Sequence, residues 1–134
     1  MNGSDFQRLA RVRLRAARLL LAGGCFDGAY YLGGYAVECA LKACIAKKTQ
    51  RHDFPDRDSN KYYTHGLETL ARIVGPQLES DIKSSVAVQA NWAIVTKWTH
   101  ESRCAFTPEQ SAASLLKAIS SPRDGVMACI RKHW

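Results

Sequence analysis

Hydrophobic residues recur every three to four positions along most of the chain, which is the spacing of amphipathic α-helices. Alternating runs rich in Val, Ile and Thr and bounded by hairpin dipeptides are missing from the sequence. The pattern therefore predicts an all-α protein. Because 134 residues are enough for one core, and no repeat is found, we expect a single helical domain over residues 1–134.

The first predicted helix begins after Ser4 or Asp5, which are both N-cap residue types, and ends near Leu21 because Gly23 and Gly24 follow. Its expected inner face contains Leu9, Val12, Ala16 and Leu19, with Ala10, Leu14, Ala17 and Leu21 beside it. The opposite face carries an arginine stripe, formed by Arg8, Arg11, Arg15 and Arg18. This stripe is either a solvated face or an anion-binding one, because guanidinium groups one turn apart can follow a phosphate backbone.

The second predicted helix runs from about Asp27, an N-cap candidate, to Lys47 or Lys48. Residues 36–46 are apolar almost all round, as expected of the central helix of a bundle. Gly33-Gly34 lowers helix propensity in the first half, so we expect another helix to approach closely there.

The remaining chain is predicted to hold one long loop and three further helical segments. Residues 49–62 are polar, contain a proline and show no period, which indicates the loop. A short helix follows from about His65 to Val74 and ends at Gly75-Pro76, and a third long helix spans roughly Glu79 to Trp98. After a loop over residues 100–107, the last helix starts at Thr107-Pro108, with Gln110 to complete a capping box, and is interrupted at Ser121-Pro122.

The chain is basic, with a net charge of +7 and a pI near 9.4. Excess positive charge raises the local concentration of phosphates and other anions, so the surface is either anion-binding or merely solvated. No apolar run reaches the roughly 18 residues that span a bilayer. The first residues also lack the order of a signal peptide, so we expect a cytoplasmic protein without membrane contact.

The cysteines are odd in number, lie in apolar surroundings and form no CxxC pair. This pattern predicts buried, reduced thiols rather than a disulfide framework or a zinc site. The five residues are Cys25, Cys39, Cys44, Cys104 and Cys129. Sequences typical of phosphate loops, nucleophile elbows and zinc-dependent proteases are absent, so we expect neither a metal nor another cofactor.

Glu38 and Lys42 are an acid and an amine one turn apart in an otherwise apolar helix. Charged groups that face a core must be paired, so we expect an ion pair that either fixes packing or a dimer interface, or lines a pocket. Arg13 projects into the apolar face of the first helix and also needs a partner, for which Glu38 is a candidate.

His65 precedes a predicted helix, where it either binds backbone groups or transfers a proton near neutral pH. Arg103 forms either a salt bridge between helices or a forked contact to a carboxylate or phosphate.

Residues 29–43 resemble the HEPN-domain pattern in which a small residue and an aromatic residue lead to a Glu-x-x-Leu-Lys core, here Glu38 to Lys42. Tyr63-Thr64-His65-Gly66-Leu67 resembles the family's His-x-Leu element, and Trp98 with Arg103 resembles its later aromatic-to-Arg-Tyr motif, with Cys104 in place of the usual Tyr. The resemblance extends from about residue 8 to 120. It implies an up-and-down four-helix bundle with an additional short helix, and a homodimer.

The resemblance also implies RNA-related functions, because many HEPN proteins cut RNA and others pair with a minimal nucleotidyltransferase. RNA-cutting members carry an Arg followed by His after four to six residues. None of the four histidines has an Arg at that distance; the nearest analogue is Lys47 before His52. We therefore expect the fold of the family without its usual ribonuclease motif.

Our functional prediction is a homodimeric HEPN-like binding module that contacts nucleotide, RNA or a nucleotidyltransferase partner, within a toxin-antitoxin or defence system. The predicted binding residues are Arg13, Glu38, Lys42, His65, Trp98 and Arg103. One alternative is a divergent, metal-independent ribonuclease toxin in which His65 is the general acid or base and Lys42 and Arg103 stabilise the pentacoordinate phosphate. Another is a purely structural interaction subunit.

Overall fold

The computed structural model describes residues 1–51 and 65–134, and within these ranges the secondary structure is helical without strands. The predicted all-α class is confirmed. In chain order the helices are α1 (Gly3–Ala22), α2 (Phe26–Arg51), α3 (Leu67–Val74), α4 (Pro76–Lys83), α5 (Val86–Val95), the 3-10 helix η2 (His100–Cys104), α6 (Glu109–Ser120) and α7 (Val126–Arg131).

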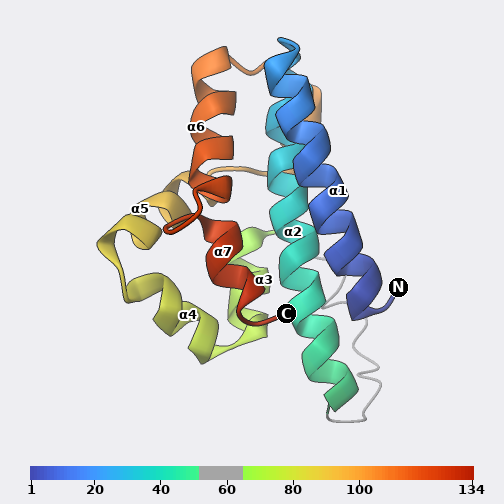
Figure 1. Ribbon diagram of the computed structural model, residues 1–134, viewed down its shortest axis with the longest axis vertical. Helices are drawn as coiled ribbons and strands as arrows, with labels where there is room; N and C mark the ends of the chain where they lie inside the picture. Colours follow the sequence, from blue (N-terminus) through green and yellow to red (C-terminus); the bar gives the residue numbers. More distant parts are fainter. Residues whose placement is uncertain (52–64) are drawn as a thin grey trace.

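The long helix α2 is the centre of the molecule (Figure 1). It runs antiparallel to α1, and α6 lies along its upper half on the other side, while α3, η2 and α7 also pack against it. Of residues 36–46, all except Lys42 are buried, because the helix has neighbours on nearly every side. The predicted central position of this segment is confirmed.

The start of α1 differs from the prediction. Asn2, rather than Ser4 or Asp5, is the N-cap: its side chain accepts a hydrogen bond from Asp5 N at 2.9 Å, and Asp5 accepts one from Asn2 N at 3.1 Å. This reciprocal capping box satisfies two donors at the helix end, and it places Ser4 and Asp5 inside the first turn.

The inner face of α1 differs in part from the prediction: Leu9 and Leu21 are partly buried and pack against the core, as does Leu20. The buried residues are Gly3, Ala10, Leu14 and Ala17. Val12 and Leu19, expected inside, are exposed because α1 packs mainly against α2, along one side. The arginine stripe lies on the outer face, with all four residues exposed.

Both ends of α2 were also predicted inaccurately. The helix begins at Phe26, so Asp27 lies within its first turn, and its carboxylate accepts a hydrogen bond from Thr107 N at 2.5 Å instead of capping α2. At the other end α2 continues past Lys48 to Arg51. The predicted loop 49–62 lies outside the described residues, apart from 49–51, which belong to α2.

The predicted third long helix is divided into α4 and α5 at Ser84-Ser85. Ser85 has extended backbone, and its hydroxyl accepts a hydrogen bond from Val88 N at 3.3 Å, so it caps a new helix rather than continuing the old one. Before them, α3 ends as predicted at Gly75, whose φ of 129° is in the region that glycine tolerates best.

The start of the last long helix was predicted one residue too early. Pro108 is the N-cap of α6, without a side-chain cap, and Thr107 instead gives its backbone N–H to Asp27. The capping box with Gln110 therefore does not form. The predicted interruption at Ser121-Pro122 is confirmed, since α6 ends at Ser120 and α7 restarts at Val126.

The close approach predicted at Gly33 and Gly34 is confirmed. A Cβ at Gly33 would collide with Leu116 of α6, and one at Gly34 would overlap the indole ring of Trp98. Among the helices described, none has the length and apolar character needed to cross a bilayer.

All five cysteines carry free thiols, but their burial differs from the prediction. Cys39, Cys44 and Cys129 are buried, whereas Cys25 and Cys104 are exposed. Cys25 lies in the turn between α1 and α2, and Cys104 ends η2, so neither is covered by a packed helix.

Candidate functional site

The carboxylate of Glu38 is the centre of the candidate site. Glu38 is 1% exposed in the middle of α2. Lys42, one turn further along, donates a hydrogen bond from Nζ to Glu38 Oε1 at 2.9 Å, which confirms the predicted ion pair. The second oxygen, Oε2, is buried and has no hydrogen-bond partner among the described residues.

His65 approaches the same oxygen from outside α2. Its Nδ1 lies 2.6 Å from Glu38 Oε1, and its side chain is 44% exposed. His65 stands two residues before α3, so the packing of α3 against α2 carries the ring to Glu38. With Nδ1 donating to the carboxylate, the neutral ring keeps its lone pair on Nε2, and the protonated ring donates from both nitrogens.

A second imidazole lies directly on the first. The rings of His65 and His100 are parallel within 11°, with centroids 4.1 Å apart. His100 also meets the edge of Tyr31 at 6.1 Å, and Tyr31 stacks on Trp98 at 6.0 Å. These aromatic contacts hold the 3-10 helix η2 against α2, so the position of His100 depends on both elements.

One row of α2 supplies the buried part of the site. Tyr31, Tyr35, Glu38 and Lys42 are spaced at i, i+4, i+7 and i+11, which places them on one side of a helix. Tyr31 stacks on Tyr35 with centroids 6.1 Å apart. The Glu38–Lys42 pair therefore extends a continuous aromatic and polar row rather than interrupting an apolar face at random.

Burial and nearby charges raise the pKa values of two groups close to Glu38. Burial, and secondarily the nearby Glu38 carboxylate, raises the pKa of Cys39 to about 11. Burial also raises the pKa of Tyr35, with Cys39 and Glu38 adding to the effect and Arg13 opposing it. Both groups are thus held in their neutral forms at physiological pH, and neither is a nucleophile.

The two histidines line an open groove, the histidine groove, with a volume of about 510 Å³. It lies between the start of α3 and the segment that joins α5 to η2. Its polar lining residues are His65, Glu68, Thr69, Arg72, Thr96, Thr99, His100 and Glu101. The imidazole, hydroxyl and guanidinium groups of this groove are suited to an anionic or polyhydroxylated ligand, and the carboxylates of Glu68 and Glu101 can accept hydrogen bonds from its hydroxyl or amino groups.

The other three predicted binding residues, Arg13, Trp98 and Arg103, do not contact the Glu38 carboxylate. Arg13 does not pair with Glu38; its guanidinium lies over the ring of Tyr35, 5.9 Å from the centroid. Trp98 lines the groove but is only 2% exposed and fills the space above Gly34, so it is chiefly a packing residue. Its Nε1 is buried without a partner in the described chain.

Arg103 lies on η2 in an exposed position. The described residues offer it no carboxylate within 4.0 Å, so the salt bridge between helices that we considered is absent there, and it does not line the histidine groove. The structure therefore brings together three of the six predicted residues around one carboxylate.

Sequence patterns did not identify His100 or Arg72 as site residues. Each is a single polar residue without a characteristic spacing to Glu38, and only the packing of η2 and α3 brings them to the groove. A helical pattern would have suggested Tyr31, because it lies seven residues before Glu38.

No group of three His, Cys, Asp or Glu residues suited to a metal ion occurs in the part of the chain that the structure describes. No family model, curated protein or solved structure matches the sequence.

Proposed function

We propose that the chain is a HEPN-like RNA-binding domain that holds a phosphate group of RNA, or of a nucleotide, in the histidine groove. The observation that carries this proposal is the 2.6 Å contact between Glu38 and His65, because it orients a half-exposed imidazole at the wall of a groove. A buried carboxylate behind a histidine selects the ring orientation and the tautomer, so that Nε2 faces the groove.

Phosphate recognition follows from the donors around this ring. When its ring carries both protons, His65 donates one hydrogen bond from Nδ1 to Glu38 and one from Nε2 to a ligand oxygen. Arg72 lines the same groove and can donate two parallel hydrogen bonds to a phosphate. The net charge of +7 adds a long-range attraction for a polyanion.

The proposal is tested by fluorescence anisotropy with a short labelled RNA over a series of salt concentrations. We expect binding that weakens steadily as salt rises, because each phosphate contact releases counterions. His65→Ala should lower the affinity roughly tenfold or more, as expected for the loss of a hydrogen bond to a charged group.

His133→Ala is a matched control. His133 also contacts a carboxylate at 2.6 Å, that of Asp81, but it lies outside the histidine groove. This variant should bind RNA like the wild type. An affinity that is independent of salt, or equal for the two variants, would contradict the proposal.

A second candidate function, metal-independent RNA cleavage, is favoured by the stacking of two imidazoles. In such a reaction one histidine takes the proton of the ribose 2′-hydroxyl, and the 2′-oxygen attacks the phosphorus. The other histidine gives a proton to the 5′-oxygen as it leaves. His65 and His100 are adjacent and Lys42 is close by, whereas Arg103, the other predicted cation, lies outside the groove. The chain also lacks the Arg-x4-6-His pattern.

Incubation of RNA with concentrated protein and a chelator separates cleavage from binding. A nuclease would leave 2′,3′-cyclic phosphate ends, and the His65→Ala and His100→Ala variants would lose this product. Bound RNA that stays intact would support the binding module alone.

The HEPN-like four-helix arrangement, the homodimer and a nucleotidyltransferase partner belong to the same proposal. The antiparallel α1–α2 pair with α6 along α2 is compatible with an up-and-down bundle. Sedimentation analysis would measure the oligomeric state, and copurification with a nucleotidyltransferase would test for the partner.

A further inference from the structure

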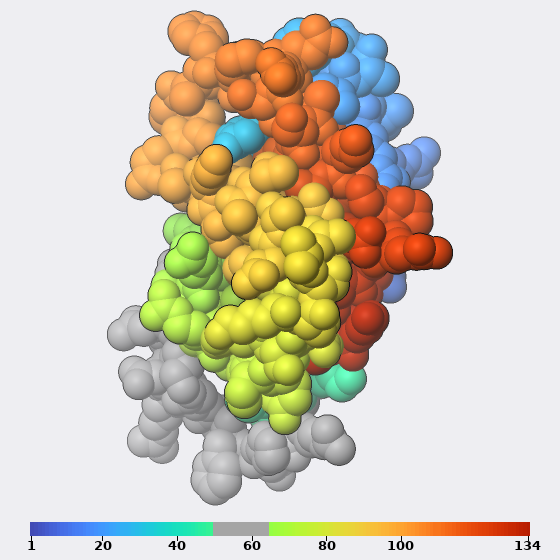
Figure 2. All heavy atoms as spheres, turned by 90° about the vertical axis from the view of Figure 1, so that its left-hand side faces the viewer, coloured from blue at the N-terminus to red at the C-terminus, as the bar shows by residue number. Residues whose placement is uncertain are grey.

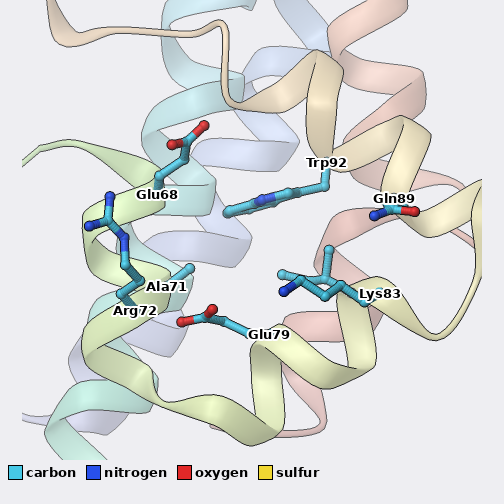
Figure 3. A pocket seen from close by; sticks show the side chains of 8 residues that line it. Glu68, Ala71, Arg72, Glu79, Lys83, Gln89 and Trp92 are labelled. Carbon is cyan, nitrogen blue, oxygen red and sulfur yellow. The ribbon is translucent and has the colours of Figure 1, made fainter.

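A second, smaller cavity adjoins the histidine groove between α3, α4 and α5 (Figure 3). Its volume is about 200 Å³. The indole of Trp92 extends from α5 across this cavity, which we call the Trp92 pocket, and Glu79 and Lys83 enter from α4. Glu68 and Arg72 border it on the α3 side.

The two cavities are neighbours along α3. Glu68 and Arg72 line both of them, on consecutive turns of the same helix. Figure 2 shows the face on which α3, α4 and α5 lie next to one another, with the segment after α5 above α3. A ligand whose phosphate lies beside His65 can therefore extend past Arg72 into the Trp92 pocket.

The aromatic wall of the pocket is suited to a flat ring. Trp92 is partly buried, since one part of the indole packs on the core while the rest faces the pocket. Every nucleobase has a π-face, so stacking on an aromatic side chain holds a base of any sequence. An indole beside a phosphate-binding groove is thus the arrangement expected of a nucleotide site rather than of a site for free phosphate.

The polar rim of the pocket can distinguish bases by their edges. Glu68 and Glu79 make no ion pair within 4.0 Å in the described parts of the chain, so their oxygens remain available as acceptors. Carboxylates accept hydrogen bonds from exocyclic amino groups, such as that of cytosine, whereas uracil presents a carbonyl oxygen at the same position. Gln89, at the opposite side, can both donate and accept.

We propose that the Trp92 pocket is a nucleobase subsite that stacks one base of the bound RNA and favours bases with an exocyclic amino group. This proposal rests on the phosphate-binding function proposed for the histidine groove. In this proposal Trp92 stacks on the base and Glu79 accepts a hydrogen bond from its exocyclic amino group. Arg72, which lines both cavities, binds the phosphate next to that base.

The test compares three labelled hexamers with equal numbers of phosphates: oligocytidine, oligouridine and an abasic ribose-phosphate chain. The wild type should bind oligouridine on the order of tenfold more tightly than the abasic chain, which is a typical effect of stacking one base. It should bind oligocytidine more tightly still. Trp92→Leu, which keeps an apolar side chain against the core, should lower the affinity for both base-bearing hexamers to that for the abasic chain.

Two further variants separate recognition from folding. Glu79→Gln should bring the affinity for oligocytidine down to that for oligouridine, and this change at a half-buried position keeps the size of the side chain. Trp134→Leu is the control, since the ring of Trp134 contacts Arg11 and Arg131 and does not line the pocket, and this variant should retain the full preference for bases.

The outcomes distinguish the two proposals. Equal affinity of the wild type for all three hexamers would overturn the base subsite and leave phosphate binding in place. A wild type that binds none of the hexamers would overturn both proposals. A preference for bases that survives Trp92→Leu would place the base elsewhere and reject this pocket.

Discussion

At the scale of single residues, Glu38 determines how the site is built. It is the one buried acidic or basic side chain in the described part of the molecule, and Lys42 and His65 both approach the same oxygen of its carboxylate. A buried charge is tolerated only when partners replace the water that it has lost. The Glu38–Lys42 contact was predictable because it is local, whereas the choice of His65 over Arg13 depended on which segment packs there.

Replacing Glu38 by Ala should destabilise the fold strongly. The change removes the partner of the largely buried Lys42 ammonium and leaves a small cavity, so the free energy of unfolding should fall by about 3 kcal/mol. Urea denaturation followed by circular dichroism measures this value. Glu109→Ala, which removes an exposed carboxylate from α6, is the control and should change stability by no more than about 0.5 kcal/mol.

A double variant shows whether the loss comes from an unpaired charge. Glu38→Leu combined with Lys42→Met replaces both charged groups by apolar ones and should recover most of the stability, since no uncompensated charge remains. If Glu38→Ala is as stable as the wild type, the ion pair has no structural role.

At the scale of elements, helix type was readable from the sequence but several helix ends were not. The apolar period through residues 79–98 continues across Ser84-Ser85, so it predicted one helix where the chain forms two. Ser85 was as compatible with a helix surface as with a cap. The turn there lets α4 pack on α3 and α5 pack on α6, while both helices contact α7. Glycines in α2 were more informative, because they indicated where other segments come close.

Gly34→Ala tests this close approach. In a solvent-exposed helix the change would stabilise by about 1 kcal/mol through helix propensity. Here the added methyl group would overlap the buried Trp98 ring, so we expect a net loss of roughly 2 kcal/mol of unfolding free energy.

Gly3→Ala is the matched control for this substitution. A Cβ at Gly3 meets its nearest neighbours at 3.6 Å, which is ordinary contact, so this variant should be as stable as the wild type or slightly more stable. A Gly34→Ala protein more stable than the wild type would mean that Trp98 can move away freely.

At the scale of the whole molecule, the burial of the cysteines reports on the integrity of the core. Burial raises the pKa of Cys39 to about 11 and that of Cys44 to about 12, and it raises the pKa of Cys129 as well. Because the thiolate is the reactive form, these three thiols are protected both by lack of access and by protonation. Cys25 and Cys104 have no such cover.

The native protein at pH 8 should therefore show two fast-reacting thiols with an aromatic disulfide reagent, and five after unfolding in urea. Absorbance of the released thiolate counts them. A Cys25→Ser/Cys104→Ser variant should show almost no fast phase. Three or more fast thiols in the wild type would contradict the packing of α2 against α1, α6 and α7.

The sequence by itself determined the helical class, the central position of α2 and the Glu38–Lys42 pair, because helix periodicity, hydrophobicity and one-turn contacts are properties of neighbouring residues. Tertiary structure alone decided that His65 reaches Glu38, that His100 stacks on His65, and that Trp92 opens onto the same face. These contacts join segments far apart in the chain, and their geometry follows from how α3, α5 and η2 pack rather than from any local pattern.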